Sequence, residues 1–138
     1  MAVIEGYNIA LKINSKTLLG RTKEDFNLSA VTKSSITKDD NGNPAERVTG
    51  HEATFTVTAL FSLDSTGTKH DRDDIFALAM AVGTNAVIPF SYEAGSGTDV
   101  GKTLSGNCVI TSYSESSSAD GDSTVTVNLK TTGTLTLT

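Results

Sequence analysis

HEATFTVTALFSL, the stretch from His51 to Leu63, alternates apolar and hydroxyl side chains. One parity carries Phe55, Val57, Ala59 and Phe61, and the other carries Thr54, Thr56 and Thr58. A period of two predicts a β-strand with one buried face and one solvated face, because a helix would scatter these apolar residues around its axis. Thr and Val suit a pleated surface. The hydroxyl face fits contact with water, a sliding polymer or a neighbouring subunit, or it is the Thr-rich outer face of an ordinary sandwich.

The composition favours one mainly β domain. The chain has 138 residues, 37% of them hydrophobic, and we expect a single domain over residues 1–138. Ser and Thr supply roughly a quarter of the residues, which favours strands and turns over helices. The net charge is −5, and Lys and Arg are scattered, so a surface that grips nucleic acid is not expected. An acidic protein can still surround DNA that it repels.

The cysteine count and the first residues bear on the compartment. Cys108 is the single cysteine, which excludes an intrachain disulfide. The opening MAVIEGYNIALKIN lacks the basic segment and long apolar run of a signal peptide, and no stretch reaches membrane-spanning length. We expect no membrane anchor and a chain that is made and folded in a cytoplasm.

Further alternating stretches predict about seven strands in all. They are expected at residues 2–13, 23–37, 51–63, 86–92, 104–115, 123–130 and 134–138. A parity change in the second strand predicts a bulge between Thr32 and Ser35. Thr131-Thr132-Gly133 is expected to break the chain, residues 93–103 to form a Gly-rich loop, and residues 116–122 to form a hairpin turn.

One amphipathic α-helix is predicted near residues 71–82. Its apolar face would consist of Ile75, Leu78, Ala79 and Val82, at helical spacing. Three aspartates, at 71, 73 and 74, would favour the first turn, and Gly83 would end the helix. A single helix of this length must dock on a sheet.

The clearest loop is KDDNGNPAERVTG, residues 38–50, which concentrates the residues that favour turns. Long polar loops in compact domains are often functional. A solvated hairpin tip is the equal alternative.

Two segments partly match known binding motifs for phosphate and calcium, and both depart from the required pattern. Gly101-Lys102-Thr103 ends like a phosphate-binding loop, but the glycine spacing fails and a strand follows where that loop needs a helix. The residues from Asp39 resemble the start of a calcium loop, yet its sixth and twelfth positions are Pro44 and Gly50.

The two histidines also lack a catalytic setting. His51 and His70 are the candidate bases, and neither lies near a nucleophile motif. The acidic residues after His70 are better explained by helix capping than by metal binding. Cys108 lies within a predicted strand and is expected to pack as a small apolar residue. We therefore expect no enzyme, no cofactor and no metal.

The order of these pieces resembles the major tail protein, or tail tube protein, family of long-tailed bacteriophages. The resemblance rests on the polar segment from Ser34 to Asp40, on Gly50 leading into TFTVTALF, and on the mid-chain helix. It is strongest in GNCVITSYSESSSADGDSTVTVNLKTTGTLTL, which spans Gly106 to Leu137. These patterns of strand, turn and glycine are moderately specific and cover most of the chain.

The resemblance implies a β-sandwich or half-barrel with a flanking helix. It also implies hexameric rings whose sheets join around a lumen, and stacking of these rings into a virion tail tube assembled in the bacterial host cytoplasm. The tube would carry DNA without specific binding and would meet a tape-measure protein and tail terminator or tip proteins. Six copies at −5 carry about −30 charges, which favours a net-repulsive conduit.

Two sets of site residues follow as hypotheses. The resemblance implies that the long loop contacts the adjacent ring, through Lys38, Asp39, Asp40, Asn41, Gly42, Asn43, Pro44, Ala45, Glu46 and Arg47. We expect the lumen to be lined by Thr54, Thr56, Thr58, Thr124, Thr126 and Asn128.

Other classes of protein remain as alternatives. A monomeric immunoglobulin-like or carbohydrate-binding β-sandwich module would carry an aromatic platform, but the chain has no Trp and only three scattered Tyr. A tube protein of a contractile tail or secretion system is close in class to the first interpretation. A small hydrolase is third.

Overall fold

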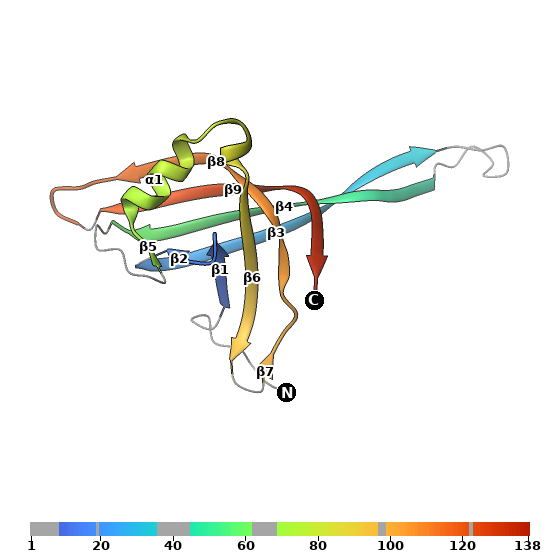
Figure 1. Ribbon diagram of the computed structural model, residues 1–138, viewed down its shortest axis with the longest axis horizontal. Helices are drawn as coiled ribbons and strands as arrows, with labels where there is room; N and C mark the ends of the chain where they lie inside the picture. Colours follow the sequence, from blue (N-terminus) through green and yellow to red (C-terminus); the bar gives the residue numbers. More distant parts are fainter. Residues whose placement is uncertain (1–8, 19, 36–44, 62–68, 97–98, 122) are drawn as a thin grey trace.

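The computed structural model describes residues 9–18, 20–35, 45–61, 69–96, 99–121 and 123–138, and it is mainly β, as predicted (Figure 1). In chain order the elements are β1 (Ile9–Ile13), β2 (Thr17–Leu18), β3 (Arg21–Ser35), β4 (Ala45–Leu60), β5 (Lys69–His70), α1 (Arg72–Met80), the 3-10 helix η3 (Gly83–Ala86), β6 (Ile88–Ser96), β7 (Asp99–Val100), β8 (Leu104–Ser116) and β9 (Thr124–Leu137).

The main sheet is antiparallel and has the strand order β1-β6-β8-β9-β4-β3, with β7 paired to β6. The short strands β2 and β5 form a separate parallel pair. The sheet curls into a half-barrel, and its two edge strands β1 and β3 approach each other.

Side chains of β3 hold these two edges together where no backbone ladder joins them. The Arg21 guanidinium donates to the carbonyl of Ile9 at 3.1 Å and to Glu24 at 2.8 Å. The Leu11 N–H donates to the other Glu24 oxygen at 3.0 Å. This closure satisfies edge groups of β1 that would otherwise be exposed for pairing with another strand.

The core fills the concave side of the sheet, as the alternation in the sequence predicts. Strand β4 contributes Ala53, Phe55, Val57 and Ala59, and β9 contributes Val125, Val127 and Leu129. Facing them are Leu11, Ile13, Ile88, Phe90 and Cys108. The Phe55 ring lies 5.2 Å from that of Phe90 and 5.4 Å from that of Tyr92, so aromatic contacts join the two sides of the core.

The helix is shorter than predicted. Asp71 caps it by accepting from the N–H of Asp74, whose carboxylate accepts from the N–H of Asp71 in return. Ile75 is fully buried. The predicted apolar face was wrong at Val82, which is 81% exposed, because the helix ends at Met80 and Ala81 is extended. Gly83, with φ of +67°, begins η3 rather than ending α1.

Two predicted breaks are instead parts of strands. β9 runs through residues 131–133 to Leu137, because Gly133 bends the strand with φ of +78°. Beside it, a Cβ on Gly106 of β8 would lie 3.0 Å from the carbonyl oxygen of Thr134, so glycine permits this close approach. The predicted Gly-rich loop is also partly strand, since β6 extends to Ser96 and β7 follows.

The predicted loop 38–50 was wrong at its second half. β4 begins at Ala45, so Ala45, Glu46 and Arg47 are strand residues paired with Ser35, Ser34 and Lys33. Lys38 to Pro44 lie outside the described residues. The expected irregularity between Thr32 and Ser35 was wrong, because these residues pair regularly with β4; the extra residue is Thr49 of β4, where the register shifts opposite Val31 and Thr32.

Burial of Cys108 predicts a specific loss of stability in alkali. Burial raises the pKa of its thiol from 9.0 to about 12. The folded chain therefore holds this proton more tightly than the unfolded chain, and the resulting stabilisation is complete below pH 9 and disappears as the pH rises to about 12. Between pH 9 and about 12, the unfolding free energy of the Cys108→Ala variant should fall less than that of the unaltered chain. Urea titration at several pH values measures both. Equal losses in both proteins would contradict the prediction.

Candidate functional site

The six residues predicted to line a lumen form one continuous patch on the side of the sheet away from the core. In the β4–β9 ladder Thr56 lies opposite Asn128, Thr58 opposite Thr126, and Leu60 opposite Thr124. Thr54 is exposed and the other five are half-buried, whereas every alternate residue between Ala53 and Ala59 is buried. The structure thus brings the six together, and their orientation toward a lumen stays a prediction.

The patch extends across two more strands that the sequence prediction left out. On β8, the residues opposite Asn128, Thr126 and Thr124 are Ser112, Ser114 and Ser116, and on β3 Asn27 lies opposite Thr54. These four residues, together with the five threonines and Asn128 above, are called the hydroxyl face. A bulge in β8 lies between Ile110, which is opposite the core residue Leu129, and Ser112, which is opposite Asn128. Strict alternation from Ile110 would place Ser112 on the core side, so the sequence pattern does not reveal these serines.

Polar side chains of the hydroxyl face bond to one another across the strands. Thr56 donates its hydroxyl to the Asn128 side-chain oxygen at 2.8 Å, and the Asn128 amide donates to the Ser112 hydroxyl at 2.6 Å. Donors and acceptors that already bond to one another leave fewer hydrogen-bonding groups free for an external ligand.

The charged side chains beside the hydroxyl face are compensated. Lys23 lies 3.6 Å from Asp25, and Lys130 lies 3.9 Å from Glu52. The charges of these two pairs sum to zero. Exposed pairs of this kind add little stability.

The distal halves of β3 and β4, residues 28–35 and 45–52, form a two-stranded ribbon that projects far beyond the body (Figure 1). This ribbon is called the arm. Its side chains contribute nothing to the core: Leu28 is 50% exposed and Val48 is 57% exposed. A two-stranded ribbon alone in water is marginally stable, so a surface that covers the arm would stabilise it.

The two faces of the arm differ in character. Residues that lie directly opposite share a face, so Leu28, Ala30 and Val48 continue the core side of the sheet, together with His51 and Thr32. Lys33, Arg47 and Glu52 lie on the other face with the hydroxyl side. The core-side face thus carries three apolar side chains together with His51 and Thr32, and all five are exposed in the described chain.

The sheet also has open edges. β6 pairs with β8 only from Leu104 to Cys108, so the described ladders leave the outer edge of residues 109–116 unpaired. The outer edge of β3 beyond Phe26 has no partner strand within the described chain. Open edges of this length favour pairing with another chain.

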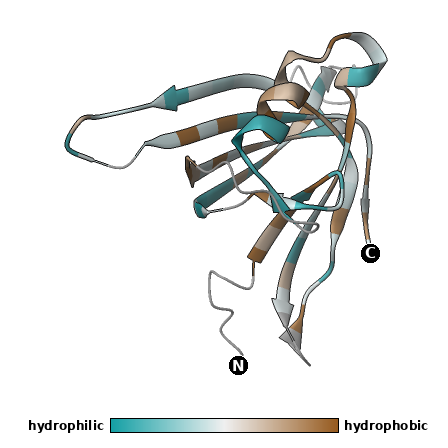
Figure 2. Cartoon of the chain, turned by 60° about the vertical axis from the view of Figure 1, so that its left-hand side comes forward, coloured by the Kyte–Doolittle hydropathy of each residue, from teal (hydrophilic) through white to brown (hydrophobic). Residues whose placement is uncertain are grey.

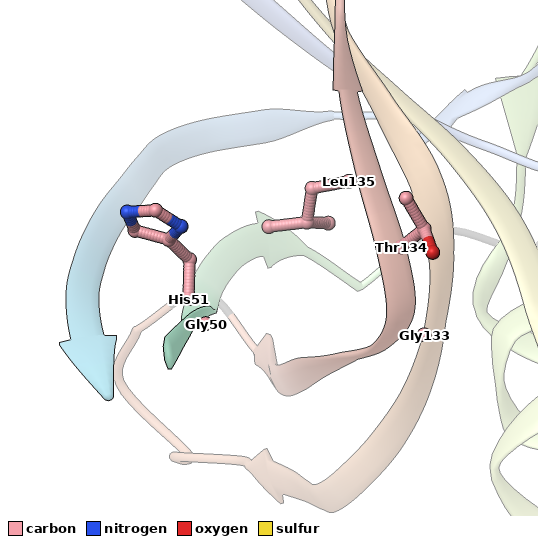
Figure 3. A pocket seen from close by; sticks show the side chains of 5 residues that line it. All are labelled: Gly50, His51, Gly133, Thr134 and Leu135. Atoms are coloured by element: carbon pink, nitrogen blue, oxygen red, sulfur yellow. The ribbon is translucent and has the colours of Figure 1, made fainter. Parts of the chain in front are cut away.

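A notch of about 350 Å³ lies where β9 bends away from β4, lined by Gly50, His51, Gly133, Thr134 and Leu135 (Figure 3). The β4–β9 ladder ends beside it, where the Ala53 N–H donates to the Thr131 hydroxyl at 3.0 Å. His51 is exposed, and the other residues that line the notch are two glycines, Thr134 and Leu135.

A cluster around Arg72 fixes α1 against β8, and the sequence analysis missed it. Arg72 donates to Glu115 and, at 2.9 Å, to Asp73, while its guanidinium lies 4.6 Å from the Phe76 ring centre. Arg72 holds the pKa of Glu115 below its usual value, assisted by the Tyr113 hydroxyl. Desolvation and this hydrogen bond raise the pKa of Tyr113 to about 12. Residues 43 positions apart carry no local sequence signal for such a contact.

His70 and the segment from Gly101 to Thr103 take part in the fold of the described chain. No three His, Cys, Asp or Glu residues there are grouped to hold a metal. His70 is buried and bonds through Nε2 to the carbonyl of Ile13, so it serves the fold. The Gly101 N–H donates to Ala94, and residues after Thr103 form β8, not a phosphate-binding helix. None of the described helices is long and apolar enough to cross a membrane.

Comparisons with known proteins identify a family and several solved structures with the same fold. A model of the phage tail tube protein family matches residues 8–137. The tail of an empty gene transfer agent particle, refined with helical C6 symmetry, has a similar chain at 16% identity, with 99% of both chains covered and a TM-score of 0.63. A search of curated proteins finds no match.

Two further solved structures share the fold. A chain of the SPP1 tail tube is 12% identical, and the match covers 95% of this chain and 77% of the SPP1 chain, with a TM-score of 0.67. The sheath/tube terminator of the extracellular contractile injection system PVC is 12% identical, and the match covers 100% of this chain and 98% of the terminator chain, with a TM-score of 0.69. At these identities the likeness shows the fold alone.

Proposed function

The chain belongs to the phage tail tube protein family, and from this premise we propose that it polymerises into stacked hexameric rings that form the tube of a virion tail. The observation that carries the proposal is the hydroxyl face, which lies between two open sheet edges. The C6 symmetry of the similar gene transfer agent tail supports six copies per ring.

Ring closure would join the open edge of β8 in one copy to the open edge of β3 in the next. Both edges belong to the same four neighbouring strands, β8-β9-β4-β3, so the joined sheet would be continuous. Closing a sheet into a barrel removes its edges. The hydroxyl face would then line the lumen, because the core, α1 and β6 occupy the other side.

The lining would let DNA pass without specific binding. Its hydroxyls and amides bond to one another, and the two ion pairs beside it carry no net charge, so the hydroxyl face itself offers no array of cations to phosphates. The proposed role is structural and not catalytic. Assembly in the host cytoplasm, a tape-measure protein in the lumen and terminator or tip proteins at the ends are parts of the same proposal.

The arm would contact the adjacent ring. It projects away from the body, as such a contact requires (Figure 1). Its far end includes Ala45, Glu46 and Arg47, and we propose that residues 38–44, outside the described part of the chain, belong to the same contact. A tube protein of a contractile tail or secretion system would use these surfaces in the same way, and the fold is shared with a component of a contractile injection system.

Electron microscopy of the purified chain tests the proposal. We expect hollow tubes in negative stain and a growing scattering mass. A Thr126→Cys variant labelled with biotin–maleimide should bind streptavidin as free subunits but not within intact tubes, because streptavidin cannot enter the lumen. Cys108 is fully buried and should not react. A strict monomer at high concentration would contradict polymerisation, and streptavidin along intact tubes would contradict the lumen assignment.

A further inference from the structure

The end of α1 and the segment after it form an uncharged, exposed surface. Residues 75–92 contain no Asp, Glu, Lys or Arg. Within them Met80 is 69% exposed, Val82 81% and Val87 42%. These three residues are called the α1–η3 patch. In Figure 2, α1 passes from teal at its start to brown and pale colours toward its end. Clustered exposed apolar side chains on a soluble domain usually mark an interface.

The helix that carries the patch lies along the open half of β8, and Val87 immediately precedes Ile88, which pairs with Cys108 where that open half begins. α1 packs on the core side of this strand, where the Phe76 ring meets Tyr113 edge-on at 5.4 Å and Arg72 bonds to Glu115. Tyr113 and Glu115 belong to the half of β8 that β6 leaves unpaired. Whatever joins this edge therefore comes next to α1.

The second uncovered apolar surface is the core-side face of the arm, made by Leu28, Ala30 and Val48. It adjoins the open edge of β3, at the opposite border of the four-stranded part of the sheet. Both surfaces lie on the same side of the sheet, since α1 inserts Ile75 into the core and Leu28 follows Phe26 on the core side.

We propose that the α1–η3 patch of one copy docks on the core-side face of the arm of the neighbouring copy in the ring. The inference rests on the proposed joining of β8 to β3, which brings α1 of one copy over β3 of the next. The contact is heterologous, with two different surfaces, so each copy can give and receive it around a ring. It would bury both apolar surfaces and hold the arm, which has little to stabilise it alone.

A charge swap tests the pairing. Val82→Asp alone and Val48→Lys alone should each lower the tube yield by roughly tenfold or more, because a lone charge would be buried in an apolar contact. The double variant should recover most of the yield, since the two charges would pair. Both positions are exposed in the single copy, so circular dichroism should show folded subunits in every case.

The matched control combines Val82→Asp with Val100→Lys, which lies on β7 and is 64% exposed. It should not recover the yield. Independently, Val82→Cys with Val48→Cys should form disulfides between copies in tubes, while the buried Cys108 stays unreacted. Normal tubes from either single variant, no recovery by the double variant, or recovery by the control would each overturn the inference. If the unaltered chain forms no tubes, the proposed function itself fails.

Discussion

Replacing residues 30–51 with Asn-Gly is expected to yield a folded monomer that no longer builds tubes. Ser29 and Glu52, which the replacement joins, lie directly opposite each other in the β3–β4 ladder. A two-residue Asn-Gly turn suits such a connection between antiparallel strands. The removed residues are outside the core, so the unfolding free energy should change little. Tube yield by negative stain should fall by roughly a hundredfold or more, because contacts that repeat in every subunit are lost together.

A second variant separates the arm from its tip. Keeping both strands of the arm but replacing residues 36–44 with Gly and Ser at the same length leaves the ribbon in place. If the tip makes the contact with the adjacent ring, this variant should form separate rings and few tubes. Tubes of normal length from the variant that lacks the arm would contradict the role of the arm in assembly.

Phe55→Ala should cause the largest loss of stability in the monomer. Phe55 is 1% exposed, and its ring contacts those of Phe26, Phe90 and Tyr92 at centroid distances of 5.0 to 5.4 Å. Removing a buried phenylalanine side chain costs about 3–5 kcal/mol, a large part of the roughly 5–15 kcal/mol that stabilises a typical domain. Urea unfolding followed by circular dichroism measures the loss.

Phe61→Ala is the matched control on the same segment. Phe61 continues the parity of Phe55 but is 38% exposed, and the Arg72 guanidinium lies 5.5 Å from its ring centre. We expect a loss of about 1 kcal/mol or less. Equal losses at the two positions would show that the core is not centred on Phe55.

The sequence by itself predicted the parts of the fold that depend on side-chain periodicity. The alternation from Thr54 to Ala59 identified both the buried and the hydroxyl face of β4, and the β9 alternation did the same for Val125 to Leu129. The aspartates before Ile75 identified the helix start, and the capping bonds of Asp71 and Asp74 confirm that interpretation. The mainly β class and the tail tube family are confirmed as well.

The ends of the strands were less predictable where a bend or a bulge in the backbone keeps turn-favouring residues within the sheet. Thr131 to Gly133 looked like a break, but a strand can bend at a glycine and continue pairing with β8. Gly50 and Thr49 suggested a loop, yet a bulge accommodates them within β4. Local residue preference cannot distinguish a turn from a bend or bulge, because the partner strand supplies the energy that keeps such residues in the sheet.

Only the tertiary structure decided which surfaces the chain presents together. The sequence placed Thr56, Asn128 and Ser112 on three separate strands, and pairing of β4, β9 and β8 brought them into hydrogen-bond contact. It likewise left the arm without cover and set α1 beside the open edge of β8 through Arg72 and Glu115. Periodicity along a strand determines which side chains share a face, but register between distant strands determines which faces become one surface, and that register depends on the packed core as a whole.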